Sequence, residues 1–216
     1  MVKIEILKSR QAWLDKRSRT IGGSDAAAII GLSPWKTNVD LWREKVQDKP
    51  KDEDNQNQNE IYGTLAEKHL REMFKLDYPG YKVGYEENNL FKNDKYPWAH
   101  ASLDGWLEHD NQRGVLEIKT ANIMSGAQAL KWAGKIPEYY YVQVLHEMAV
   151  YDADFAYIKA LLRKLKDREI YQEVKHYRID RADVSEEIAY LMNSEQLFWE
   201  YVQEKRKPGL ILPEIA

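Results

Sequence analysis

Two neighbouring segments carry acidic and basic side chains at a spacing that suits metal-assisted chemistry. Asp104 precedes a glycine, and the run Leu116–Lys119 follows it after a polar turn. Residues two apart on an extended strand point to the same face, so Glu117 and Lys119 lie together while Ile118 points into the core. If the two segments pair as strands, two carboxylates and one ammonium group converge.

Such a group is suited to the hydrolysis of a phosphodiester. Mg²⁺ prefers hard oxygen ligands, which Asp104, Glu117 and the backbone carbonyl of Ile118 provide. Lys119 is then placed to orient or deprotonate a water molecule, or to stabilise charge on the attacked phosphate. The alternative is a solvated hairpin with an ordinary cross-strand pair of charges, because a Glu-x-Lys sequence also arises by chance.

The surrounding pattern predicts a mixed α/β domain that positions these residues. Helices are expected at 10–20, 62–76, 137–150 and 184–205, and another is expected to begin at Pro34. Short strands are expected at 83–85, 90–91, 101–107 and 115–118, with a hairpin at 155–162 and 171–179. This order favours a single domain over residues 1–216.

Glycine and polar residues mark the breaks between elements near the N-terminus. Gly22 and Gly23 form a turn, Ser24 or Asp25 can cap the helix that follows, and Gly31 can end it. Residues 47–60 are polar throughout, which predicts a surface loop or a disordered segment.

Composition excludes several classes of protein. The 216 residues contain no cysteine, which excludes disulfides, thiolate metal sites and cysteine-ligated iron–sulfur clusters. No run approaches the roughly 20 apolar residues that span a bilayer, and the N-terminus lacks the apolar run of a secretory signal, so a cytoplasmic protein is expected. The net charge of -3 argues against a passive nucleic-acid binder with a basic face.

Histidines and tryptophans give weaker signals. His100, His109 and His146 show no His-x-x-x-His spacing, so zinc is not expected. Trp35 and Trp42 either contact DNA or pack in the core, and packing is the favoured interpretation.

Asp104 followed by Glu117-Ile118-Lys119 resembles the signature of the PD-(D/E)xK nucleases. Leu103 stands where that signature has its proline, which shapes the turn and supplies no ligand. Further segments are similar to one branch, the lambda-exonuclease or YqaJ-type viral recombinase family, and they occur in the family's order. These segments are Trp13–Arg17, Ile21–Ile29, Gly31–Trp35, Gly63–Glu67 and Tyr141–Met148.

The resemblance implies a restriction-endonuclease-like core, with a mixed central β-sheet flanked by helices. It implies a Mg²⁺-dependent 5′-to-3′ exonuclease on the ends of double-stranded DNA, in which Mn²⁺ is expected to substitute. The 3′ single-stranded overhangs would pass to a strand-annealing protein in phage or prophage recombination, within a bacterial cytoplasm. A homotrimeric ring around the DNA is also implied. Two alternatives stay open: another nuclease on this core, such as an endonuclease, and a non-catalytic DNA-binding or scaffold protein.

The resemblance also implies roles for residues near the N-terminus. Arg17 and Ser24 match positions that hold the terminal 5′ phosphate. An arginine offers a bidentate fork to phosphate, and a serine hydroxyl beside helix-start N–H groups favours an anion. Arg19 competes with Arg17 for this role, and a plain helix cap is the alternative for Ser24.

Two helical residues complete the implied site. Glu67 matches a metal-site glutamate, the alternative being a solvated residue at the edge of an apolar face. Gln143 matches the first glutamine of a Gln-x-Gln that approaches the metal site. Leu145 replaces the second glutamine, which leaves a boundary role for Gln143 open.

Overall fold

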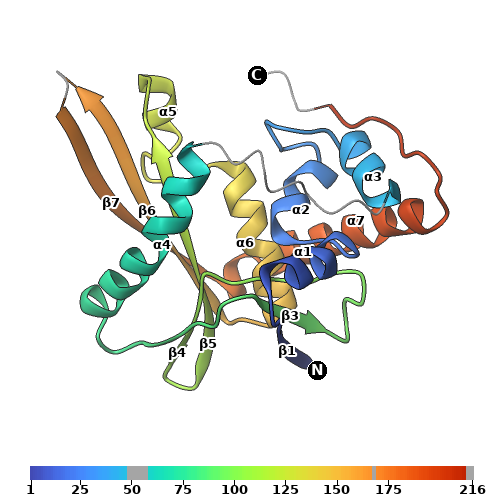
Figure 1. Ribbon diagram of the computed structural model, residues 1–216, viewed down its shortest axis with the longest axis horizontal. Helices are drawn as coiled ribbons and strands as arrows, with labels where there is room; N and C mark the ends of the chain where they lie inside the picture. The colour runs from blue at the N-terminus through green and yellow to red at the C-terminus, as the bar shows by residue number, and fades with distance from the viewer. Residues whose placement is uncertain (48–57, 167–168, 213–216) are drawn as a thin grey trace.

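A five-stranded mixed sheet forms the centre of the fold in the computed structural model, which describes residues 1–47, 58–166 and 169–212 (Figure 1). In spatial order its strands are β2 (Lys82–Gly84), β4 (Gly105–His109), β5 (Gln112–Asn122), β6 (Phe155–Lys166) and β7 (Glu169–Asp180). Strands β5 and β6 run parallel, and the other neighbours run antiparallel. The predicted mixed sheet, and the pairing of the segments that contain Asp104 and Glu117, are confirmed.

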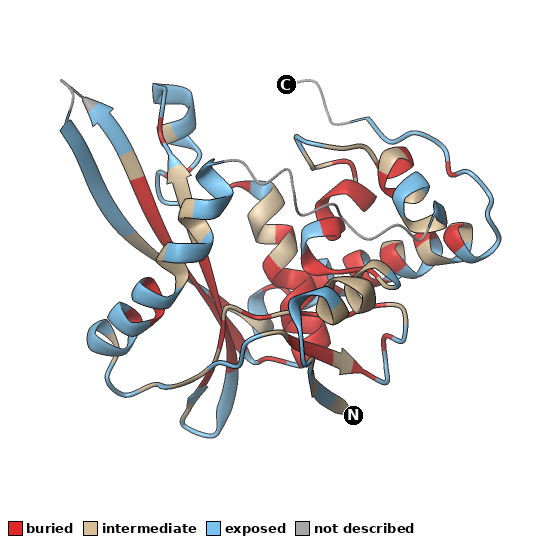
Figure 2. Cartoon of the chain, in the orientation of Figure 1, coloured by how far each residue is buried: buried red, intermediate tan, exposed pale blue. Residues whose placement is uncertain are grey.

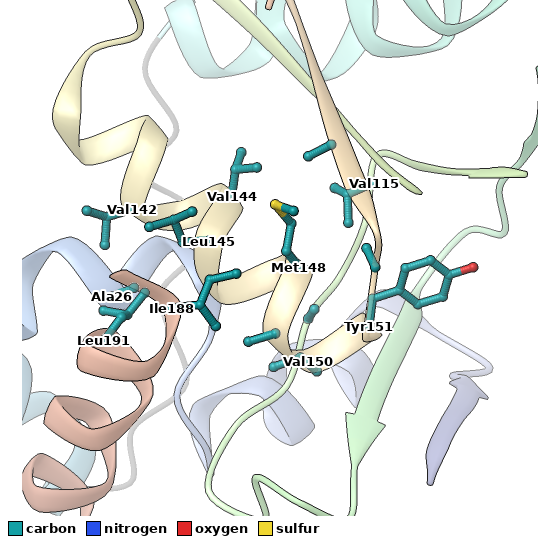
Figure 3. Close-up of a cluster of buried hydrophobic side chains, with 14 of the residues drawn as sticks. Ala26, Val115, Val142, Val144, Leu145, Met148, Val150, Tyr151, Ile188 and Leu191 are labelled. Carbon is teal, nitrogen blue, oxygen red and sulfur yellow. The ribbon is translucent and has the colours of Figure 1, made fainter. Parts of the chain in front are cut away.

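Helices cover both faces of the sheet. One face packs against α4 (Gln58–Asp77), whose Leu70 and Phe74 meet apolar residues of β4, β5 and β6. The other face packs against α6 (Glu138–Tyr151), which is backed by α2 (Gly23–Ile29) and α7 (Ser185–Gln203) (Figures 1 and 3). Helix α6 is buried along most of its length, whereas the end of the β6–β7 hairpin and the outer side of α4 are exposed (Figure 2).

Alternate residues of β5 face the two layers. Leu116 and Ile118 belong to the apolar cluster under α4, while Val115 belongs to the cluster under α6. The two-residue period therefore turns Glu117 and Lys119 towards α6. Strand β4 begins at Gly105, opposite Leu116, so in the described chain the rest of β5 has no strand on that side.

The remaining elements support this centre. Helix α1 (Arg10–Ser18) and helix α3 (Asn38–Gln47) lie on the α2 side (Figure 1). Strand β1 (Val2–Ile6) pairs with β3 (Asn89–Asn93) in a separate two-stranded sheet. A short helix, α5 (Gly126–Leu130), follows β5, and a 3₁₀ turn (Arg181–Asp183) precedes α7. The sequence pattern predicted neither β1 nor α5, because both are short and lack a clear period.

One predicted helix start is wrong, and at a second helix one of the two predicted capping residues makes the cap. Helix α3 begins at Asn38 and not at Pro34, because Thr37 and Asp40 form a reciprocal capping pair there. Helix α2 has Gly22 at its N-cap position, and of the two predicted capping residues it is Asp25 that caps the helix start. The buried carboxylate of Asp25 accepts a hydrogen bond from the Gly22 N–H at 3.2 Å.

Two other segments differ in extent from their predictions. Helix α4 begins at Gln58, four residues earlier than expected, so part of the predicted polar loop is helical. Most of that loop, residues 48–57, lies outside the described residues. Among the described helices, none is both long and apolar enough to cross a membrane.

Candidate active site

Asp104 lies where β4 begins, beside the open edge of β5. Its Oδ2 accepts a hydrogen bond of 2.9 Å from the N–H of Ile118. Its backbone carbonyl accepts a hydrogen bond from the buried guanidinium of Arg71 on α4. The aspartate is therefore anchored to the sheet on one side and to α4 on the other.

Glu117 and Lys119 meet on the α6 side of β5, as their spacing predicts. The Nζ of Lys119 lies 2.5 Å from Oε1 of Glu117, whose side chain is only 2% exposed. Burial alone would lower the pKa of Lys119, but the carboxylates of Glu117 and Asp104 outweigh it and raise the pKa. Lys119 is thus a charged ammonium group near neutral pH.

Glu67 of α4 reaches the same place from the other layer. It is half-buried, and burial together with the negative charge of Glu117 raises its pKa from an ordinary value of 4.5 to about 7. Burial and the charges of Glu117 and Glu67 also raise the pKa of Asp104 well above its usual range. Three carboxylates therefore repel one another here, which a bound cation would relieve.

The donor set suits Mg²⁺. Asp104, Glu117 and Glu67 supply carboxylate oxygens, and Ile118 supplies a backbone carbonyl at the same edge. Nowhere in residues 1–47, 58–166 and 169–212 do three acidic or histidine side chains already surround a point where a metal ion would sit. Lys119 contacts Oε1 of Glu117 directly, so a bound cation would compete with this ammonium group for the carboxylate.

Gln143 of α6 links the acidic and basic groups. Its Oε1 accepts a hydrogen bond from Lys119 Nζ at 3.0 Å, and its Nε2 donates to Glu117 Oε1 at 2.7 Å. Leu145 is 2% exposed and belongs to the core cluster under α6 (Figure 3). The second position of the Gln-x-Gln pattern therefore faces the core in this chain, and the first position faces the site.

Glu147 was not predicted. It lies one helical turn after Gln143, is 2% exposed, and its Oε1 accepts a second hydrogen bond from Gln143 Nε2 at 2.8 Å. Burial and the charge of Glu117 raise its pKa well above the usual range. One signal in the sequence points to it: an acidic residue at the start of the helical run 147–151, which is otherwise apolar.

The residues predicted to bind phosphate lie on the two N-terminal helices. Arg17 of α1 packs its guanidinium 4.0 Å from the centre of the Trp13 ring. Burial lowers the pKa of Arg17, and the charges of Asp25, Glu147 and Asp104 oppose this effect. Arg17 is thus within electrostatic range of the metal-site candidates. Ser24 is exposed on the first turn of α2.

Two of the histidines are buried and make structural contacts. His146 is fully buried, with Nδ1 2.7 Å from Glu195 Oε1 and Nε2 2.8 Å from the carbonyl oxygen of His100. His100 Nδ1 lies 2.8 Å from the Thr20 hydroxyl. These contacts join α6 to α7 and to the segment before β4.

The two tryptophans have different surroundings. Trp42 is half-buried and donates a hydrogen bond to the Tyr201 carbonyl, which agrees with packing. Trp35 is 68% exposed, so the prediction that it packs in the core is wrong. Its ring stands edge-on against Tyr139, with centroids 4.8 Å apart, and Tyr140 lies beside both of them.

Comparison with known proteins finds a matching family model and a related protein. The model of the YqaJ-like viral recombinase domain matches residues 12–154. The uncharacterized protein YqaJ of Bacillus subtilis is 32% identical over 157 residues, which cover 71% of this chain and 47% of that protein. The chain thus spans about half the length of the curated relative it matches.

Solved structures share the fold. An alkaline exonuclease from Laribacter hongkongensis, also solved in complex with dAMP, superposes with a TM-score of 0.67 at 18% identity. The match covers 91% of this chain and 94% of that one. A phage-related exonuclease from Haemophilus somnus gives a TM-score of 0.57 at 14% identity, with coverages of 86% and 96%.

Proposed function

The chain belongs to the YqaJ-like viral recombinase family, and from this we propose that it is a Mg²⁺-dependent 5′-to-3′ exonuclease acting on double-stranded DNA ends. Family and fold support a nuclease role. The observation that carries the proposed metal-assisted hydrolysis is the cluster of Asp104, Glu117 and Lys119, in which an ammonium group and two carboxylates meet beside an open strand edge.

The residues divide the chemistry of hydrolysis between them. When bound, Mg²⁺ would stabilise charge on the phosphate and lower the pKa of a coordinated water. Asp104, Glu117, Glu67 and the Ile118 carbonyl would hold it, and Mn²⁺ would substitute. Lys119 would orient the attacking water or stabilise the charge that develops on the phosphate. Gln143, hydrogen-bonded to Lys119, would hold that ammonium group in place.

The DNA end would be held by the N-terminal helices. In this proposal Arg17 binds the terminal 5′ phosphate through its guanidinium, and the Ser24 hydroxyl adds a hydrogen bond. Support comes from the position of Arg17, within electrostatic range of Asp104. Hydrolysis from this end would leave a 3′ single-stranded overhang, to be taken up by a strand-annealing protein in phage-type recombination in a bacterial cytoplasm.

Incubation of linear and closed-circular duplex with Mg²⁺, and then with EDTA, tests the activity. We expect only linear DNA to be digested, with loss of a 5′ label before a 3′ label, and no digestion in EDTA. Nicking of circles would indicate an endonuclease on this fold. Absence of digestion with both Mg²⁺ and Mn²⁺ would indicate a non-catalytic DNA-binding or scaffold protein.

Assembly is proposed on the family resemblance. A chain with a net charge of -3 has little general attraction for DNA, so continuous digestion needs a physical hold on the duplex. A homotrimeric ring supplies it, because one heterologous interface closes on itself by cyclic symmetry. Light scattering should give three times the 25.4 kDa chain mass, and digestion should continue after a heparin trap is added. A monomer that stops at the trap would refute the ring.

A further inference from the structure

Glu147 combines burial with incomplete hydrogen bonding. Its side chain is 2% exposed, and its Oε2 has no hydrogen-bonding partner within the described chain. The first turn of α2 packs against it, since a Cβ atom on Gly23 would stand 2.8 Å from Oε1. Among the described residues, Gln143 Nε2 donates a hydrogen bond of 2.8 Å to Oε1 of Glu147.

This arrangement is costly for the fold. A buried carboxylate loses its hydration and needs compensating hydrogen bonds, which only one of its two oxygens has here. The neighbouring carboxylates of Glu117 and Asp104 add repulsion, and with burial they raise the pKa of Glu147. An apolar residue of similar volume would avoid both costs. A carboxylate that destabilises its surroundings in this way points to a role outside stability.

The hydrogen bonds of Gln143 show what the carboxylate does. The two N–H groups of Nε2 point to Glu117 Oε1 and Glu147 Oε1, so the amide oxygen faces Lys119 Nζ. A flipped amide would set its oxygen against two carboxylates and its N–H groups against an ammonium group. Glu117 accepts a hydrogen bond from only one of the two N–H groups of Gln143 Nε2. The other N–H group donates to Glu147.

We propose that Glu147 is a positioning residue that locks the Gln143 amide in one orientation and thereby holds Lys119 at the candidate active site. Glu147 acts through Gln143 and needs no contact with the DNA. Its consequence for catalysis rests on the nuclease function proposed above, whereas its effect on the Gln143 side chain does not.

The test compares three single variants, Glu147→Leu, Glu147→Gln and Gln143→Ala. A fourth protein combines Glu147→Leu with Gln143→Ala. Loss of an orienting partner typically costs 10–100-fold in activity, so Glu147→Leu should lower kcat by about that factor and leave the KM for DNA unchanged. Glu147→Gln should recover most of the loss, because its amide oxygen can still accept from Gln143. The combined variant should be no slower than Gln143→Ala, since both changes act on one contact.

Stability separates positioning from a structural role. Glu147→Leu should change Tm by no more than about 2–4 °C, because removal of a buried, half-satisfied carboxyl group offsets the loss of the acceptor for one Gln143 N–H. Glu147 would have a structural role if Tm fell by more than this together with activity. A matched change of an exposed acid on the same helix, Glu138→Gln, should alter neither quantity.

Three further outcomes would overturn the proposal. The first is normal turnover of Glu147→Leu, and the second is an additive loss of kcat in the combined variant. The third is a weaker affinity of Glu147→Leu for Mn²⁺ in calorimetry, because that result would make Glu147 a metal ligand. If the wild-type protein cuts no DNA, the proposed function fails. Crystal structures of the wild type and of Glu147→Leu would still decide whether Glu147 positions the Gln143 side chain. The proposal requires Gln143 to leave Lys119 in the variant, and an unmoved Gln143 would refute it.

Discussion

The carboxylate of Asp104 accepts the hydrogen bond of the Ile118 N–H at a point where no neighbouring strand pairs with β5 on that side in the described chain. Pairing between β4 and β5 ends at Gly105 and Leu116, and two residues further along β5 the Asp104 carboxylate accepts the Ile118 N–H, which a longer ladder would have bonded to the facing backbone. The N–H and C=O groups of one extended residue point to the same edge of a strand. The Ile118 carbonyl is therefore turned to the edge where Asp104 stands, which supports the pairing of these two groups as metal ligands.

Lys119→Ala is expected to abolish cleavage while folding and DNA binding persist. The ammonium group acts on charge that develops during reaction, and removal of one such group costs about 10²–10³-fold in kcat. Glu117 keeps its hydrogen bond from Gln143 in the variant, which limits the damage to the fold. Single-turnover cleavage and fluorescence anisotropy with labelled DNA in Ca²⁺ provide the measurements.

Two comparisons make this result specific. Asp104→Ala and Glu117→Ala should lose activity in the same way and should also bind Mn²⁺ more weakly. Lys82→Ala, which removes an exposed lysine paired with Glu108 on β4, should behave as the wild type. Near-normal turnover of Lys119→Ala would remove this lysine from the proposed mechanism.

Glu67 should make the stability of the metal-free protein depend on pH. Its pKa is about 7 in the folded chain and near 4.5 when unfolded, so the folded state binds more protons between these values. The unfolding free energy therefore falls as pH rises from about 4.5 to about 7, and stays reduced above that. Glu67→Gln should raise Tm at pH 8 and have little effect at pH 5, measured by calorimetry in EDTA.

Metal addition provides the complementary measurement. Ionised Glu67 is the form that binds a cation, so Mg²⁺ should raise Tm more at pH 8 than at pH 6. Glu72→Gln serves as the control on the same helix, because Glu72 is exposed and pairs with Lys75. If the Tm of Glu67→Gln follows the same pH profile as the Tm of the wild type, then the neighbouring carboxylates do not raise the pKa of Glu67.

Gly23→Ala is expected to impair activity more than stability. The added Cβ would stand 2.8 Å from Glu147 Oε1 and 3.1 Å from Gln143 Cγ, so both side chains must move. Crowding of this kind costs about 1 kcal/mol or more in a packed interior. The displaced groups position Lys119 in our proposal, so kcat should fall by about tenfold or more.

Gly126→Ala is the matched control. Gly126 is also the first residue of a helix, α5, and a Cβ atom there would meet nothing within 4 Å. This variant should keep the wild-type kcat and Tm. Equal turnover of Gly23→Ala and Gly126→Ala would mean that the packing of α2 on α6 has no bearing on the chemistry.

The sequence contained enough local information for the centre of the site. A two-residue period and a polar turn predict the hairpin that joins Asp104 to Glu117 and Lys119, because these residues are close in the chain. In the structure Asp110 and Asn111 make that turn, both with positive φ. Pro137 likewise stands directly before the helix that carries Gln143.

Features that depend on packing between distant segments escaped prediction. The importance of Glu147 arises only when α6 lies against β5 on one side and α2 on the other. Arg71, on α4, binds the Asp104 carbonyl across 33 positions of sequence. Neither contact leaves a periodic trace in the sequence. The predicted helix start at Pro34 is wrong because Thr37 and Asp40 form a capping pair that begins the helix at Asn38.

Arg17 should give the enzyme a preference for a phosphorylated 5′ end. Its guanidinium is held over Trp13 and remains cationic, because arginine does not lose its proton near neutral pH. Duplex with a 5′ phosphate should therefore be digested faster than duplex with a 5′ hydroxyl, and Arg17→Ala should erase most of the difference. Ser24→Ala should reduce it by a smaller factor, since a neutral hydrogen bond contributes less than a charged one. The control is Arg19→Ala, two positions away and exposed, which should keep the preference. Initial rates on the two substrates decide the assignment, and it fails if the wild type shows no preference or if Arg19→Ala removes it.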